Sequence, residues 1–223
     1  FDHTPSPSHA ERGSNGAALF SASAVITIAC GTADQRSPTD GTLTETAYEN
    51  AFFGFTLPLP AGWSVATPET EEHLREEGRR AMVGDDPQFE ASVEAATAKT
   101  SQLLTVSQHP VGAAVPFNPM IIVMAEKIAH APGIKTGADY LFHLGGALER
   151  SAIPYEPRGE VSAVDLGGRT FHRRDFEISP PSGITQSYVV AREGEYALAF
   201  ILTARNQTEI KDLLSLVSKT HFR

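Results

Sequence analysis

The chain has 223 residues, of which 41% are hydrophobic and 20% are charged, and its net charge is −9 at neutral pH. This length and composition suit one packed domain with a tail, and they exclude a chain that is disordered throughout. The acidic balance argues against a nucleic-acid partner, because phosphate binding requires a surface rich in lysine and arginine.

The N-terminal part, residues 1–46, is predicted to lie outside the folded domain, which we expect to span residues 47–223. Residues 1–17 are rich in Ser, Pro, His and Gly without periodicity, which is typical of disorder. Residues 17–31 are apolar and uncharged. They are too short for a transmembrane helix of about 20 residues and are typical of the hydrophobic region of an export signal. The polar run 31–46 then predicts a tether.

The end of this apolar run resembles the lipobox of bacterial lipoproteins, where the signal is cut before a cysteine that then receives lipid. Ala29 directly precedes Cys30, whereas Thr27 departs from the Leu, Val or Ile that the motif prefers. The pattern predicts an exported protein of the cell envelope, periplasmic or on the outer surface, with Cys30 as the lipidation site. The alternative is a buried strand that ends in a buried cysteine, since Val25 and Ile26 have high β-propensity. Cys30 is the only cysteine, which excludes an internal disulfide.

The globular part opens with a run of aromatic residues and prolines, "FFGFTLPLPAGW" at 52–63. We expect a strand at 54–58 on the edge of a sheet, because the two nearby prolines cannot donate ladder hydrogen bonds. A turn at 60–62 is predicted to bring Trp63, the only tryptophan, back toward the core. The aromatic residues are interpreted as closing one end of the core, and the alternative is a platform for a ligand.

Four helices are predicted from their N-terminal caps. Thr67 and Asp86 each precede a proline at the first helical position, which is a frequent helix start. Thr136 and Asp139 form a capping-box pattern before a third helix, and Asn206 caps the last one. The last two helices each carry an apolar stripe, which predicts burial against a sheet.

The remaining regular segments are predicted strands. Residues 101–108 contain Leu103, Leu104 and Val106, whereas residues 119–128 are apolar on both alternating faces, which predicts a central position. Residues 158–203 form segments separated by short connections containing Gly or Pro, as in an antiparallel meander. Together these elements predict an α+β fold in which an antiparallel β-sheet is sandwiched by helices.

Three segments resemble PsbP-like domains: "YENAFFGFTLPLPAGWSV" from Tyr48, "VDLGGRTFHRRDF" from Val164 and "YALAFILTARNQTEIKDLLSLVSKTHF" from Tyr196. The resemblance extends from Tyr48 to Phe222 and implies an α-β-α sandwich around an antiparallel sheet. It also implies an exported bacterial protein, often a lipoprotein. The named relatives are non-enzymatic: one stabilises a photosystem and another binds a small GTPase. The sequence holds no motif specific to either partner, so neither function is carried over.

Sequence motifs of the common enzyme classes are absent. The patterns Gly-x-Ser-x-Gly, His-Glu-x-x-His and Gly-x-Gly-x-x-Gly do not occur, and neither does the P-loop pattern. The sequence therefore predicts a protein that is not an enzyme and has no cofactor.

Two pairs of polar residues are weak candidates for binding. Asp139 and His143 lie four residues apart on a predicted helix, so both could reach one metal ion. Such a pair needs further ligands, and we expect no metal site, because a hydrogen-bonded pair on an exposed face is the commoner case. Arg173 and Asp175 alternate on a predicted strand. They could grip an anionic partner or form ion pairs across strands.

The sequence thus predicts a non-catalytic binding or assembly module of the cell envelope, secreted or tethered to the membrane only through a lipid on Cys30. Its partner is expected to be a protein or a small molecule, and not a nucleic acid. The alternative is an envelope hydrolase or metal-dependent enzyme whose site is dispersed over loops. A deep cleft with convergent His, Asp or Ser side chains would favour that alternative.

Overall fold

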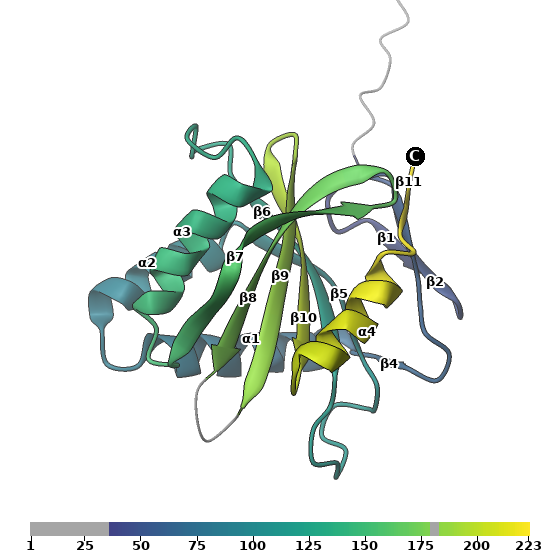
Figure 1. The fold of residues 1–223 in the computed structure, drawn as a ribbon, viewed down its shortest axis with the longest axis horizontal. Coiled ribbons are helices and arrows are strands. Elements are labelled where there is room, and N and C mark those ends of the chain that lie inside the picture. Colours follow the sequence, from purple (N-terminus) through teal and green to yellow (C-terminus); the bar gives the residue numbers. More distant parts are fainter. Residues whose placement is uncertain (1–35, 179–182) are drawn as a thin grey trace, which may run out of the picture. The chain divides into compact units, whose positions relative to one another are not determined.

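The computed structural model describes residues 36–178 and 183–223, which belong to one folded unit. Its main sheet has seven antiparallel strands in the order β4-β5-β6-β10-β9-β8-β7 (Figure 1). These are β4 (Ser64–Val65), β5 (Thr100–Ser107), β6 (Met120–Lys127), β7 (Tyr155–Leu166), β8 (Arg169–Ile178), β9 (Ile184–Glu193) and β10 (Tyr196–Ala204). The predicted export signal and Cys30 lie outside the described residues.

A second antiparallel sheet contains four short strands in the order β1-β2-β3-β11. They are β1 (Gly41–Leu43), β2 (Ala47–Asn50), β3 (Phe55–Pro58) and β11 (His221–Phe222). His221 pairs with Thr56 and Phe222 with Phe55, so strand β11 joins a sheet built mainly from the beginning of the domain. Neither β1 nor β11 was predicted, because two or three residues are too few to show an alternating pattern.

The folded unit begins earlier than the predicted boundary at Ala47. Gly41 pairs with Asn50 in the ladder between β1 and β2, and the Asn50 side-chain amide donates to the Pro38 carbonyl (2.8 Å). Part of the predicted tether therefore belongs to the domain. Its polar side chains misled the prediction, since β1 is exposed along its whole length and depends on backbone pairing more than on apolar burial.

The predicted edge position of the strand at 54–58 is only partly correct. Strand β3 lies between β2 and β11, so its first half has a neighbour on both sides. β11 pairs only with Phe55 and Thr56, however, which leaves Pro58 opposite Ala47 with no second partner strand. The proline is tolerated because no ladder hydrogen bond is required from it on that side.

All four predicted helices form with the predicted caps. They are α1 (Pro68–Val83), α2 (Pro87–Thr97), α3 (Gly137–Glu149) and α4 (Gln207–Val217). Thr67, Asp86 and Asn206 accept hydrogen bonds from backbone amides of the first helical turn, and α3 has a complete capping box. Each cap satisfies amides that have no partner within the helix.

The main sheet is covered on both faces, which confirms the predicted fold class. On one face, Ala197, Ala199 and Ile201 of β10 share a core with Tyr140, Leu141 and Leu148 of α3. On the other face, Leu198, Phe200 and Leu202 share a core with Ile210, Leu213 and Val217 of α4. Figure 1 shows α3 and α4 on either side of strands β8, β9 and β10.

Helices alone were predicted to cover both faces of the sheet, but the layer that contains α4 also contains the small sheet. The small sheet and its β2–β3 turn contribute buried aromatic and aliphatic side chains to the same core as α4, namely Tyr48, Phe53, Phe55 and Leu57. Strand β6 lies inside the main sheet, between β5 and β10, as its two apolar faces predict. Within the described ranges, no helix combines the length and the hydrophobicity that crossing a membrane would require.

Candidate functional site

Asp139 and His143 lie on the first turns of α3, but the Asp139 carboxylate is occupied by the helix cap. It accepts hydrogen bonds from the Thr136 hydroxyl (2.9 Å) and from the backbone amides of Lys135 (3.0 Å) and Thr136 (2.8 Å). His143 is exposed, with its ring against that of Phe142 (5.6 Å between centroids). Across residues 36–178 and 183–223, no three His, Cys, Asp or Glu side chains are grouped so that they could hold a metal ion.

The hydrogen bonds from the Thr136 hydroxyl and the two amides hold the pKa of Asp139 below its usual value of 3.8. A carboxylate with a lowered pKa in the folded state stabilises the protein above its usual pKa, and this contribution is lost as the pH falls through the folded pKa. We therefore expect Asp139→Ala to lower the thermal unfolding midpoint at neutral pH, and the difference from the parent protein to shrink in acid.

The control for this prediction is His143→Ala, which leaves the cap hydrogen bonds intact and removes only the smallest contribution to the lowered pKa of Asp139, so it should change the midpoint much less than Asp139→Ala. Thermal unfolding followed by circular dichroism from about pH 7 to about pH 2.5 extends below the usual pKa of an aspartate carboxyl group, where the difference should begin to shrink. A difference between the parent protein and Asp139→Ala that stays constant over this range would contradict the assignment.

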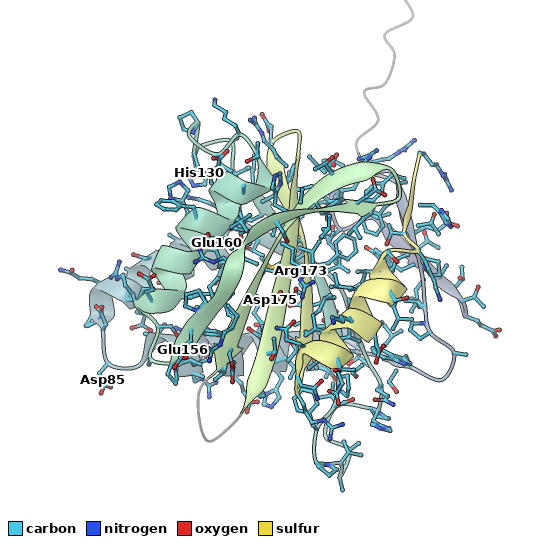
Figure 2. All side chains as sticks on the ribbon, in the orientation of Figure 1. Asp85, His130, Glu156, Glu160, Arg173 and Asp175 are labelled. Carbon is cyan, nitrogen blue, oxygen red and sulfur yellow. The ribbon has the colours of Figure 1, made fainter. Side chains whose placement is uncertain are left out.

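The structure brings Arg173 and Asp175 together on β8, on the face of the sheet that α4 covers (Figure 2). The guanidinium donates two hydrogen bonds to the carboxylate (2.8 and 2.6 Å) and a third to the buried Ser187 hydroxyl on β9 (2.9 Å). The ion pair therefore lies within one strand and not across strands. The hydrogen bond to Ser187 makes this cluster a link between β8 and β9. Because Asp175 already neutralises Arg173, little positive charge remains for an anionic partner.

A better candidate site surrounds Trp63. The predicted turn forms, with the Trp63 amide donating to the Pro60 carbonyl (3.2 Å), and the indole packs partly against the core beside α4. Trp63 is not fully buried, and it lines two hollows of about 540 and about 510 Å³. We call these two hollows together the Trp63 groove.

The first hollow of the Trp63 groove lies beside the small sheet. Its lining includes Leu43, Glu45, Leu59, Pro60 and Val65. Leu43 is one of the few large apolar side chains that the described part of the chain exposes strongly, at 49%. An exposed leucine beside an indole and a proline provides apolar surface that a partner could cover.

The second hollow lies between α4 and the loop that connects β5 to β6. Its lining includes Val115 and Phe117 from the loop and Asp212, Leu213 and Leu216 from α4. Figure 1 shows this loop extending past the end of α4 on the side of β4. Sequence elements that are far apart, around residues 43–65, 108–119 and 205–216, thus meet at Trp63.

Side-chain hydrogen bonds hold the base of the β5–β6 loop. The Asn118 side chain accepts from the His109 amide (2.9 Å) and donates to the His109 carbonyl (2.8 Å), and the Ser107 hydroxyl donates to the same carbonyl (2.7 Å). Backbone bonds from Gln108 to Pro119 and from Ala113 to Pro110 add further closure. A loop held in this way keeps its apolar side chains in place before a partner arrives, which reduces the entropy lost on binding.

The sequence analysis placed none of these residues in a binding site, and it favoured a core role for Trp63. Trp63 stood out as the only tryptophan, and a ligand platform was the alternative interpretation of the aromatic run. The residues of α4 and of the β5–β6 loop carry no motif, and only the tertiary fold brings them to Trp63. Trp63 packs on the core with part of its side chain and lines the groove with the rest.

No protein-family model matches the chain, and no curated protein matches it. Among solved structures, it is similar to the solution structure of cyanobacterial PsbP (CyanoP) from Synechocystis sp. PCC 6803. The identity is 12% and the TM-score 0.46, over 82% of this chain and 95% of that chain. It is also similar to the crystal structure of LpqN, which is involved in cell envelope biogenesis of Mycobacterium tuberculosis. There the identity is 17% and the TM-score 0.39, over 75% of this chain and 82% of that chain. A PsbP is thus among the structures that the chain resembles, as the sequence predicts.

Proposed function

We propose that this domain is a non-catalytic binding module of the cell envelope, which docks a partner protein in the Trp63 groove. The observation that carries the proposal is the groove itself, where apolar side chains from separate chain segments remain uncovered around a half-buried indole. Trp is among the residues that contribute most to the affinity of protein interfaces, because it buries a large apolar surface at a small entropic cost.

The groove also has the construction of a preformed docking surface. One wall is α4, whose Ile210, Leu213 and Val217 are anchored in the core, and the other is the loop closed by Asn118. Neither wall needs to fold when a partner binds. A partner can therefore use its binding energy for contacts, with little ordering of this chain.

Photo-crosslinking in intact cells tests the proposal. A photoreactive phenylalanine derivative is introduced in place of Leu216, which lines the groove, or in place of its exposed neighbour Ser215, which does not. We expect a discrete crosslinked product from position 216 that is absent from position 215. Combining position 216 with Phe117→Glu should remove the product, because a carboxylate would then occupy the opposite wall.

The same experiment can refute the proposal. Identical crosslinking patterns from positions 215 and 216, or a product at 216 that survives Phe117→Glu, would show that the groove does not select a partner. Far-UV circular dichroism of each purified variant establishes that the fold is intact, so a lost product cannot be explained by unfolding.

We also propose that the protein is exported and is held at the membrane by lipid on Cys30, as the lipobox-like end of the apolar run indicates. A single acyl chain binds membranes only weakly, whereas several chains on one residue anchor a protein stably, at about 0.8 kcal/mol per buried methylene group. Mass spectrometry of the mature protein should find lipid on Cys30, and Cys30→Ser should move the protein from the membrane fraction to the soluble fraction. An unmodified Cys30 in the mature protein would reject the anchor.

A further inference from the structure

The charges at the margin of the Trp63 groove are predominantly acidic. Glu45 belongs to the first hollow and Asp212 to the second, and both residues are exposed. Within the described residues, neither carboxylate forms an ion pair or a side-chain hydrogen bond. Unpaired carboxylates at the margin of an apolar surface attract cations and repel anions.

The arginine that lines the second hollow is already neutralised. Arg205 is the one Lys or Arg that lines either hollow in the described ranges, and its guanidinium binds Glu209 (2.6 and 2.9 Å), which also lines the second hollow. The backbone amide of Arg205 donates to the same carboxylate (3.0 Å), which fixes this pair at the start of α4. The margin therefore presents the negative charges of Glu45 and Asp212 around an apolar floor.

We infer that the occupant of the groove is a cationic amphipathic segment of a partner protein, with apolar side chains in the two hollows and lysine or arginine at their margins. This inference rests on the proposed function and adds the chemistry of the partner to it. Apolar contacts would provide most of the affinity, and the two acidic margins would select the charge and orientation of the segment. An arginine or lysine of the segment could also contact the face of the indole.

Other occupants fit the charges less well. A second copy of this chain would place like charges at the interface, because the net charge is −9 and both margins are acidic. An acidic segment would meet the same repulsion. An uncharged segment or an acyl chain could fill the apolar hollows, but it would leave both carboxylates without a partner, so the charges predict no preference for it.

The single tryptophan makes the test direct, because tryptophan emission from this chain reports only on the groove. The full chain is titrated with three synthetic peptides of equal length that contain no aromatic residue. They combine leucine with lysine, with glutamate or with glutamine in the same amphipathic pattern. We expect the Leu/Lys peptide to change the emission saturably, and the Leu/Glu peptide to bind at least about 10-fold more weakly, corresponding to 1.4 kcal/mol.

Matched variants test whether Glu45 and Asp212 cause the preference for the cationic peptide. Glu45→Gln combined with Asp212→Asn should weaken the Leu/Lys peptide about 3- to 10-fold, as expected for two exposed ion pairs. The control combines Glu94→Gln with Glu149→Gln, two exposed acids on α2 and α3 that line neither hollow. It changes the net charge equally and should leave the affinity unchanged.

The outcomes separate the inference from the proposed function. Equal weakening by the two double variants would show general attraction to an acidic protein and would overturn the inference. The inference would also be overturned if the Leu/Gln peptide bound as tightly as the Leu/Lys peptide. That result would remain compatible with the proposed function, in which a partner docks on the apolar surface of the groove. If no peptide changes the emission but position 216 crosslinks specifically, the inference is wrong and the proposed function survives. If that crosslink is absent as well, both are wrong.

Discussion

Replacing Phe200 with alanine is expected to lower the free energy of unfolding by about 3–5 kcal/mol, as for other fully buried aromatic residues. Phe200 lies on β10 in the middle of the main sheet and has no exposed surface. Its ring makes edge contacts with Phe55 of the small sheet (5.9 Å between centroids) and with Phe171 of β8 (5.8 Å). The substitution would leave a cavity where the two sheets meet, and a rigid core of this kind cannot collapse fully to fill it.

Phe142→Ala is the control for this prediction, because the ring of Phe142 on α3 is 72% exposed. Its removal should change the free energy of unfolding by no more than about 0.5 kcal/mol. Urea denaturation followed by far-UV circular dichroism measures both variants. If Phe200→Ala unfolds at the same urea concentration as the parent protein, the two sheets do not share the core described above.

Two alanine substitutions on α3 are expected to have opposite effects on stability. A Cβ atom at Gly137 would overlap the carbonyl oxygen of Val190 on β9 and lie 3.3 Å from Nδ1 of His172. Backbone atoms of a central strand cannot move aside, so Gly137→Ala should destabilise the protein by about 1–3 kcal/mol or more. At Gly146, a Cβ atom would have no neighbour within 4 Å. Gly146→Ala should therefore stabilise the protein by about 0.5–1 kcal/mol through the higher helix propensity of alanine.

Thermal unfolding of the two variants side by side measures this difference, and the helix and the chemical change are the same in both. Stabilisation by both substitutions would mean that α3 does not contact β9 at Gly137. Destabilisation by both would mean that the outer face of α3 is covered by something other than solvent.

Local chemistry accounts for what the sequence predicted well. A cap such as Asp86 followed by Pro87 acts on the amides of its own helix, so the start of α2 could be read without knowing the tertiary fold. The two apolar faces of Met120–Lys127 reflect cover on both sides, and β6 does lie inside the sheet. In both cases, the residues that determine the structure are neighbours along the chain.

Features that depend on distant residues could not be read from the sequence. Strand β11 joins the small sheet through the pairing of Phe222 with Phe55, and nothing in either segment of the sequence indicates this pairing. The Trp63 groove likewise depends on how α4 and the β5–β6 loop are placed. The capping role of Asp139 was predicted from its spacing to Thr136, whereas the pairing of Asp175 with Arg173 along its own strand was not.

The position of β11 has a consequence for when the protein can fold. Beyond the pairing of Phe222 with Phe55, the amide of Arg223 donates to the Gly54 carbonyl (2.8 Å), and its guanidinium bonds Glu49 (3.2 Å), 174 residues away in the chain. A nascent chain on the ribosome cannot make these contacts until all the intervening residues, and Phe222 and Arg223 themselves, have been translated. Until then, the aromatic surface of Phe55 that Phe222 later covers stays open. Contacts of such long range slow folding, so the last step in completing the tertiary structure is expected to follow the completion of synthesis.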